Sequence, residues 1–246
     1  MTFKYKHSMK EKRGFDRFYN LAIPQWVERF GEPESILEIG IGGGGGHFMW
    51  NKNFPRARVV GIDPLLPEMD NGSQKGGLSG TASAVQFLAT RDIGTQARVD
   101  FIFADGLNNG VIDRIGEAYG KFDLIVFDAT DYNHKNYPYV IPLWQSHLSD
   151  KGLLIHELPG IRGWNRRTQE LLQDPDPQIG RLQRCVDQGA VVYNFDSIST
   201  HIEQEEEYPG HWRDNRIAVL DNAAYQQLDM DDLDQYIWKA EGDKYQ

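Results

Sequence analysis

Five short runs of apolar residues alternate with segments of helical character along the first two thirds of the chain. The apolar runs lie at 35–40, 57–63, 99–105, 121–130 and 152–158. Near-continuous apolar strands are typical of a parallel sheet that is covered on both faces. The segments of helical character between them lie at 47–54, 109–119 and 139–148. The alternation therefore predicts an α/β fold, a doubly wound three-layer sandwich around a mostly parallel sheet.

Two more apolar runs, 190–196 and 216–221, come late in the chain. This pair predicts an antiparallel strand added at the edge of the sheet. Ahead of the first strand, residues 15–30 carry aromatic side chains at helical spacing, and we expect a helix there that covers the ligand mouth. The chain is accordingly divided into an N-terminal helical cap, 1–34, and a main domain, 35–246.

Composition and charge narrow the classes of function. The 246 residues are 40% hydrophobic and carry a formal net charge of -10, which fits one globular domain with a sizeable core. The negative charge repels polyanions on average, so nucleic acid is a poor partner. Cys185 is the only cysteine, and no apolar run reaches the ~18 residues of a membrane span. We therefore expect a cytoplasmic protein with no membrane partner.

A glycine run at 42–46 begins two residues after the first strand ends. Together with Gly40 it satisfies the pattern G-x-G-x-x-G, and Asp63 ends the next strand about 20 residues further on. Backbone amides and a helix N-terminus would face a ligand at such a loop. The Asp63 carboxylate can accept hydrogen bonds from two ribose hydroxyls, although a helix N-cap ahead of Pro64 is the alternative. The loop therefore predicts either a dinucleotide or S-adenosylmethionine.

Two acidic residues favour S-adenosylmethionine. Glu38 stands two residues before Gly40, where a carboxylate would oppose a pyrophosphate but suits the cationic methionine end of this cofactor. Asp105 follows the third strand, where an acid can accept a hydrogen bond from the adenine amino group. The long segment ahead of the first strand and the late pair of strands favour the same cofactor.

These stretches resemble the class I S-adenosylmethionine-dependent methyltransferases, and more narrowly the macrolide-sugar O-methyltransferase and cephalosporin-hydroxylase-like group. Members of this group show an E-I-G-V-G-G-G-G loop, for which this chain has E-I-G-I-G-G-G-G. An M-W helix start, an F-P-x-A strand lead-in and a G-I-D strand end are shared, and the similarity covers roughly residues 15–160. The resemblance implies a homo-oligomer, and it implies cofactor roles for Glu38, Gly40, Gly42, Asp63 and Asp105. We place Gly106 and Asp128 in the same cofactor-binding set.

In that group a magnesium ion often binds near the substrate diol. Its ligands are an acid that ends strand four and two adjacent acids that end strand five. The counterparts in this chain are Asp128, Glu157 and Leu158, and a leucine cannot ligate a metal. The resemblance therefore leaves two hypotheses open: a magnesium site that includes Asp128 and Glu157, or a metal-free acid/base cluster.

The function predicted from these residues is O-methylation of a small-molecule hydroxyl, as in natural-product or sugar tailoring. Methyl transfer by in-line displacement requires an aligned acceptor and a base. Asp131 stands where the group has a histidine base, and His134 lies close to it, so we place this pair ahead of His156, for which a buried core histidine is the alternative. Two rival functions are an NAD(P)-dependent oxidoreductase and a non-catalytic protein of the same fold.

Overall fold

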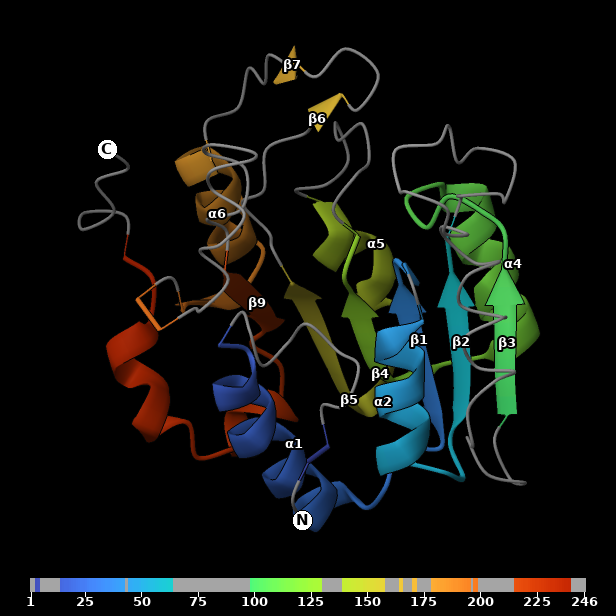
Figure 1. The fold of residues 1–246 in the computed structure, drawn as a ribbon, viewed down its shortest axis with the longest axis horizontal. Coiled ribbons are helices and arrows are strands. Elements are labelled where there is room, and N and C mark those ends of the chain that lie inside the picture. Colours follow the sequence, from blue (N-terminus) through green and yellow to red (C-terminus); the bar gives the residue numbers. More distant parts are fainter. Residues whose placement is uncertain are drawn as a thin grey trace, which may run out of the picture.

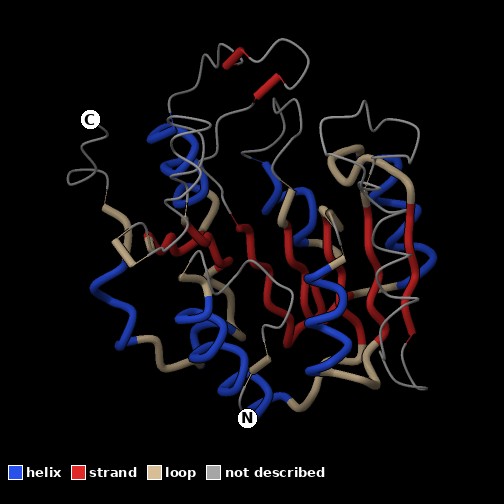
Figure 2. Tube along the Cα trace, viewed as in Figure 1, coloured by secondary structure: helices blue, strands red, loops and turns tan. Residues whose placement is uncertain are grey.

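The centre of the molecule is a seven-stranded sheet with helices on both faces (Figure 1, Figure 2). The computed structural model describes residues 3–4, 14–42, 44–63, 98–129, 139–157, 164–165, 170–171, 178–195, 197–198 and 215–239. The strands of the sheet are β1 (Ser35–Ile39), β2 (Arg58–Ile62), β3 (Arg98–Ile102), β4 (Phe122–Phe127), β5 (Leu148–Glu157), β8 (Ala190–Asn194) and β9 (Arg216–Leu220).

The strand order is β3-β2-β1-β4-β5-β9-β8. Strands β1 to β5 are parallel to one another, and β9 is antiparallel to both of its neighbours. The predicted doubly wound, mostly parallel sheet is therefore confirmed. The antiparallel strand lies one place in from the edge. All five residues of β9 are buried, so this strand needs a neighbour on each side, and β8 takes the outer place.

Four of the helices match segments predicted from the sequence. They are α1 (Asp16–Phe30), α2 (Gly45–Asn53), α4 (Asn109–Tyr119) and α5 (Val140–Gln145). The described ranges also contain α6 (Gln178–Asp187), and two short strands, β6 (Trp164–Asn165) and β7 (Glu170–Leu171), form a separate antiparallel pair. Near the C-terminus, the 3-10 helices η4 (Tyr225–Gln227) and η5 (Asp231–Tyr236) follow β9, and the Trp238 amide donates to the carbonyl of Val192.

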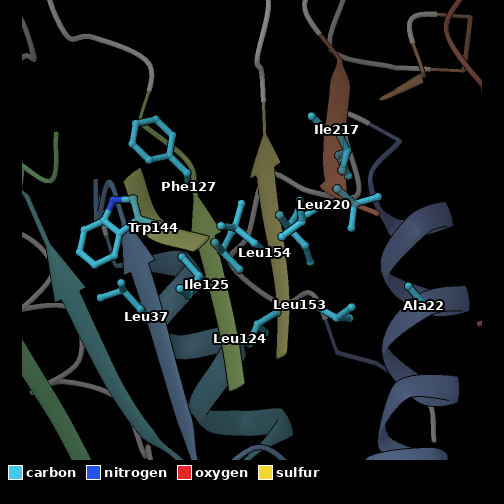
Figure 3. Close-up of a cluster of buried hydrophobic side chains, with 14 of the residues drawn as sticks. Ala22, Leu37, Leu124, Ile125, Phe127, Trp144, Leu153, Leu154, Ile217 and Leu220 are labelled. Carbon is cyan, nitrogen blue, oxygen red and sulfur yellow. The ribbon is translucent and has the colours of Figure 1, made fainter. Parts of the chain in front are cut away.

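The helices are divided between the two faces of the sheet, with α1 and α2 on one face and α4 and α5 on the other (Figure 1). Side chains that alternate along each strand fill both layers. Leu37, Ile125, Phe127, Leu154 and Trp144 lie close together in one part of this core (Figure 3). No helix in the described ranges is long and apolar enough to cross a membrane.

Helix α1 lies along β5 and runs in the opposite direction. The Trp26 indole Nε1 donates to the carbonyl of Lys151, near the start of β5, at 2.6 Å. The Tyr19 hydroxyl reaches Glu157, at the end of the same strand. The buried side chains of α1 belong to the same core cluster as the sheet. The division of the chain at residue 34 stays a prediction.

Candidate functional site

The ends of four parallel strands bring one glycine and three acids into a single row. Ile39 is in register with Ile62 on one side and Phe127 on the other, and Phe127 is in register with His156. The next residues along these strands are Gly40, Asp63, Asp128 and Glu157. Two backbone hydrogen bonds continue the row, from the Gly40 amide to the Ile62 carbonyl and from the Asp128 amide to the Ile39 carbonyl, both at 2.8 Å.

The glycine loop turns tightly against strand β4. Gly40 has a φ of 93°, and a Cβ atom there would lie 2.3 Å from the carbonyl oxygen of Asp128. Only glycine fits a backbone that adopts this φ and lies this close to another. Gly44 is in the left-handed conformation at the N-cap of α2, and no side chain caps this helix. The loop therefore leads the backbone from β1 straight into the N-terminus of α2.

A buried carboxylate lies beneath this loop. Glu38 is 1% exposed, and a Cβ atom on Gly46 would lie 1.8 Å from its Oε1 atom. Glycine at position 46 therefore makes room for the carboxylate, whose Oε1 atom faces the backbone of Gly46.

The other carboxylate oxygen, Glu38 Oε2, pairs with Nδ1 of His47. A Cβ atom on Gly61 would lie 2.3 Å from His47 Nε2, and the His47 ring stacks on Phe101 with ring centroids 5.2 Å apart. Sequence reasoning did not single out His47. Its only local signal is a histidine directly after the glycine run, because the contact with Glu38 depends on how α2 packs on the sheet.

Asp63 shapes the glycine loop from the neighbouring strand. Its Oδ2 atom accepts hydrogen bonds from the amides of Ile41 at 3.0 Å and Gly42 at 3.2 Å, and the residue is 2% exposed. These charge-assisted bonds fix the loop where a ligand would approach its backbone. The predicted contact with ribose hydroxyls stays a prediction.

The turn between β3 and α4 lies at the same edge. Asp105 is exposed, and its Oδ1 atom accepts from the Leu107 amide at 2.9 Å. Gly106 packs so closely on β1 that a Cβ atom would lie 2.6 Å from Ile39 Cγ2, and its carbonyl accepts from the Trp144 indole. Phe103 is 50% exposed and offers an apolar surface here that sequence reasoning did not identify.

Tyr19 of α1 completes the row at Glu157. Its hydroxyl donates to Glu157 Oε1 at 2.5 Å, and both residues are buried. Burial raises the pKa of Tyr19 well above its usual value, and the negative charges of Glu157, Asp128 and Glu38 raise it further. Tyr19 is therefore a protonated hydrogen-bond donor at physiological pH, and the three acids lie close enough for their charges to act on it.

His156 lies apart from this group, because it precedes Glu157 in the strand and its side chain points to the opposite face. It packs edge-on against Phe127 with ring centroids 5.0 Å apart, and burial lowers its pKa to about 3. The surroundings are those of the core-histidine alternative, and we leave His156 out of the proposed site. Asp131 and His134 lie outside the described residues.

The described residues do not fit the magnesium site that the resemblance implies. Within the described ranges, no three His, Cys, Asp or Glu side chains gather as a metal site. Glu157 Oε1 accepts a hydrogen bond from the Tyr19 hydroxyl, and Leu158 stands where the resembling group has an acidic ligand. Magnesium prefers six oxygen ligands and usually keeps several waters. A carboxylate that is buried against a phenol leaves no room for those waters.

No protein-family model and no curated protein matches this chain. Solved structures of methyltransferases do show similarity. MycE methyltransferase from the mycinamycin biosynthetic pathway, in complex with Mg and SAH, is 18% identical over 90% of this chain and 49% of its own, with a TM-score of 0.45. The O-methyltransferase of a trans-AT PKS multienzyme from Brevibacillus brevis, in complex with S-adenosyl-L-homocysteine, is 14% identical over 80% of this chain and 63% of its own, with a TM-score of 0.45.

A third similar structure is the plantazolicin methyltransferase BpumL in complex with SAH. It is 14% identical over 86% of this chain and 85% of its own, with a TM-score of 0.44. This chain spans about half the length of the MycE chain. All three TM-scores lie below 0.5, so the functional proposal rests on the residues of this chain.

Proposed function

We propose that this protein is an S-adenosylmethionine-dependent methyltransferase that methylates a hydroxyl group of a small molecule. The observation that carries the proposal is the pair of buried carboxylates at the glycine loop. The Glu38 carboxylate packs against Gly46, and Asp63 accepts hydrogen bonds from the amides of Ile41 and Gly42. A pyrophosphate at this loop would be repelled by Glu38, whereas the ammonium and sulfonium groups of S-adenosylmethionine would be attracted to it.

The residues around the glycine loop have defined parts in this proposal. Asp63 orients the ribose, and Glu38, held by His47, faces the methionine end of the cofactor. Asp105 accepts a hydrogen bond from the adenine amino group, and Phe103 covers the adenine ring. When bound, the cofactor supplies an electrophilic methyl group.

We place the methyl acceptor at the carboxyl end of β4, next to Asp128. The acceptor hydroxyl must lose a proton during in-line attack, and we assign this step to Asp131 together with His134. Natural-product or sugar tailoring is the chemistry that we propose for the acceptor. A cytoplasmic homo-oligomer stays a prediction.

Titration calorimetry tests the cofactor. We expect one molecule of S-adenosylhomocysteine to bind per chain and NAD to give no heat of binding. Asp63→Asn should weaken the binding of S-adenosylhomocysteine at least tenfold, or by about 1.4 kcal/mol, because it removes a charged hydrogen-bond acceptor from both the ribose and the loop. The matched control is Asp113→Asn on α4, an exposed acid that should change nothing. NAD binding in preference to S-adenosylhomocysteine would favour the oxidoreductase.

Methyl transfer is tested separately, with labelled S-adenosylmethionine and a library of small molecules that carry hydroxyl groups. We expect labelled products from the wild type and little from Asp131→Asn or His134→Gln. Cofactor binding that persists without transfer to any hydroxyl would favour the non-catalytic alternative.

A further inference from the structure

The hydrogen bond between Tyr19 and Glu157 occupies the carboxylate that the resemblance assigns to a metal. The Tyr19 hydroxyl donates to Glu157 Oε1 at 2.5 Å, a short bond between a phenol and a carboxylate. The Tyr19 side chain has no solvent exposure and Glu157 is 1% exposed. Glu157 is therefore held by a donor from another element of the fold.

The surroundings of this bond are aromatic. The ring of Tyr19 stacks on Phe3 at 6.2 Å and meets Phe18 and Trp50 edge-on, with ring centroids 5.6 Å and 5.8 Å away. A magnesium ion usually keeps several waters, and each water needs polar partners. Apolar ring faces do not supply such partners, so a hydrated cation at Oε1 would have to displace the phenol.

Helix α1 cannot easily give way. The Trp26 indole donates to the Lys151 carbonyl at 2.6 Å, so α1 is bonded to β5 near both ends of the strand. Phe18, Ala22 and Ile23, on the same helix, are fully buried in the core. The Tyr19 hydroxyl can therefore move away from Glu157 only if the packed helix moves or the Tyr19 side chain adopts another rotamer.

We propose that the Tyr19 hydroxyl takes the place of a divalent cation on Glu157, so that a phenol from α1 orients this carboxylate and no metal binds it. Tyr19 is thus a positioning residue that acts through Glu157. The inference rests on the proposed function, which makes the carboxyl edge of β4 and β5 the acceptor side of the site.

Metal binding is measured by electron paramagnetic resonance of Mn²⁺ added to the wild type in the presence of S-adenosylhomocysteine. We expect the spectrum of free Mn²⁺, and an affinity for S-adenosylhomocysteine that EDTA leaves unchanged. One Mn²⁺ ion bound per chain in the wild type, and lost in Glu157→Gln, would overturn the proposal. Calorimetry on the same samples separates this result from a failure of the proposed function, because absent S-adenosylhomocysteine binding counts against the function and leaves the Mn²⁺ result standing.

A second measurement tests the bond itself. Tyr19→Phe and Glu157→Gln, alone and together, are compared by urea unfolding, and we expect the double variant to lose less stability than the two single losses added. Trp26→Phe is the matched control, because it removes a different hydrogen bond between α1 and β5, and its stability loss should be additive with that of Glu157→Gln. Additive losses for the Tyr19 pair would show that the bond is not formed.

A gain of metal binding shows whether Tyr19 positions Glu157 or only packs in the core. Leu158→Glu restores the adjacent acid of the resembling group. We expect this variant to bind Mn²⁺ at least tenfold more tightly when Tyr19→Phe is also present, because Glu157 Oε1 is then no longer occupied by the phenol. Equal Mn²⁺ affinity with and without Tyr19→Phe would contradict the proposal.

Discussion

At the scale of single residues, the glycines around the loop serve different contacts. Gly40 allows the backbone to approach the carbonyl of Asp128, and Gly46 leaves room for the carboxylate of Glu38. Gly61, on the neighbouring strand, leaves room for His47. Gly42 and Gly44 instead adopt positive φ angles, which favour glycine because it has no side chain.

Gly46→Ala should therefore damage the site. A Cβ atom at this position would lie 1.8 Å from Glu38 Oε1, so the carboxylate must move or the helix must shift. We expect a loss of about 1–3 kcal/mol in the free energy of unfolding and weaker binding of S-adenosylhomocysteine, measured by urea unfolding and calorimetry.

Gly110→Ala is the matched control for this change. Gly110 is the second residue of α4, as Gly46 is of α2, but within the described ranges its added Cβ would meet Asn108 Oδ1 alone, at 3.4 Å. Alanine has the higher helix propensity, so stability should stay equal or rise. Equal losses in the two variants would show that the contact with Glu38 is not what requires glycine at position 46.

His47→Leu tests the buried pair on the same helix. The change removes the imidazole that pairs with the buried Glu38 carboxylate, and losing a hydrogen bond to a buried charged group in this way costs about 1.5–3 kcal/mol. Adding Glu38→Gln should recover part of the loss, because the buried charge is then removed. Chemical denaturation of the three variants measures this, and a double variant less stable than His47→Leu would contradict the assigned pairing.

At the scale of elements, α1 is also bonded to the C-terminal segment. Gln25 Nε2 donates to the Asp229 carbonyl, and Gln25 Oε1 accepts from the Asp229 amide, both at 2.7 Å. Gln25→Ala removes both bonds, so we expect a loss of about 1–2 kcal/mol and faster hydrogen exchange at the Asp229 amide.

Gln183→Ala on α6 is the comparison for this prediction. Among the described residues, Gln183 Nε2 donates to Asp187 Oδ1, four residues along the same helix, at 2.9 Å. Such a pair contributes about 0.2–0.5 kcal/mol. If both variants lose the same amount of stability, the link between α1 and the C-terminal segment is not the cause.

The elements themselves could be predicted because their signals are local. The helix expected at 109–119 has these limits in the structure, where the Asn108 side chain accepts from the Val111 amide and Gly120 follows with a positive φ. The place of β9 between β5 and β8 could not be predicted, because no local pattern records which strands pair. The motifs placed Glu38, Gly40 and Asp63 in one site, whereas the partners His47 and Tyr19 depend on how α2 and α1 pack.

At the scale of the whole molecule, a buried histidine links global stability to pH. His156 has no solvent exposure, and burial lowers its pKa from 6.5 to about 3. Above pH 6.5 it is neutral in both the folded and the unfolded chain. As the pH falls below 6.5, the unfolded chain binds a proton that the folded chain rejects, so stability is lost until the pH reaches the folded pKa.

Each pH unit between these pKa values costs about 1.4 kcal/mol for one proton, so His156 alone should remove about 2 kcal/mol between pH 7 and pH 5. Urea unfolding of the wild type at both pH values measures the total change, to which carboxylates also contribute. His156→Gln cannot bind this proton and keeps those carboxylates, so its loss over the same interval should be smaller by about 2 kcal/mol. The comparison uses the difference between the two pH values, so the cost of placing glutamine in the core cancels. Equal losses in the two proteins would mean that His156 is protonated in the folded chain, in which case a partner in the fold would have to stabilise its charge.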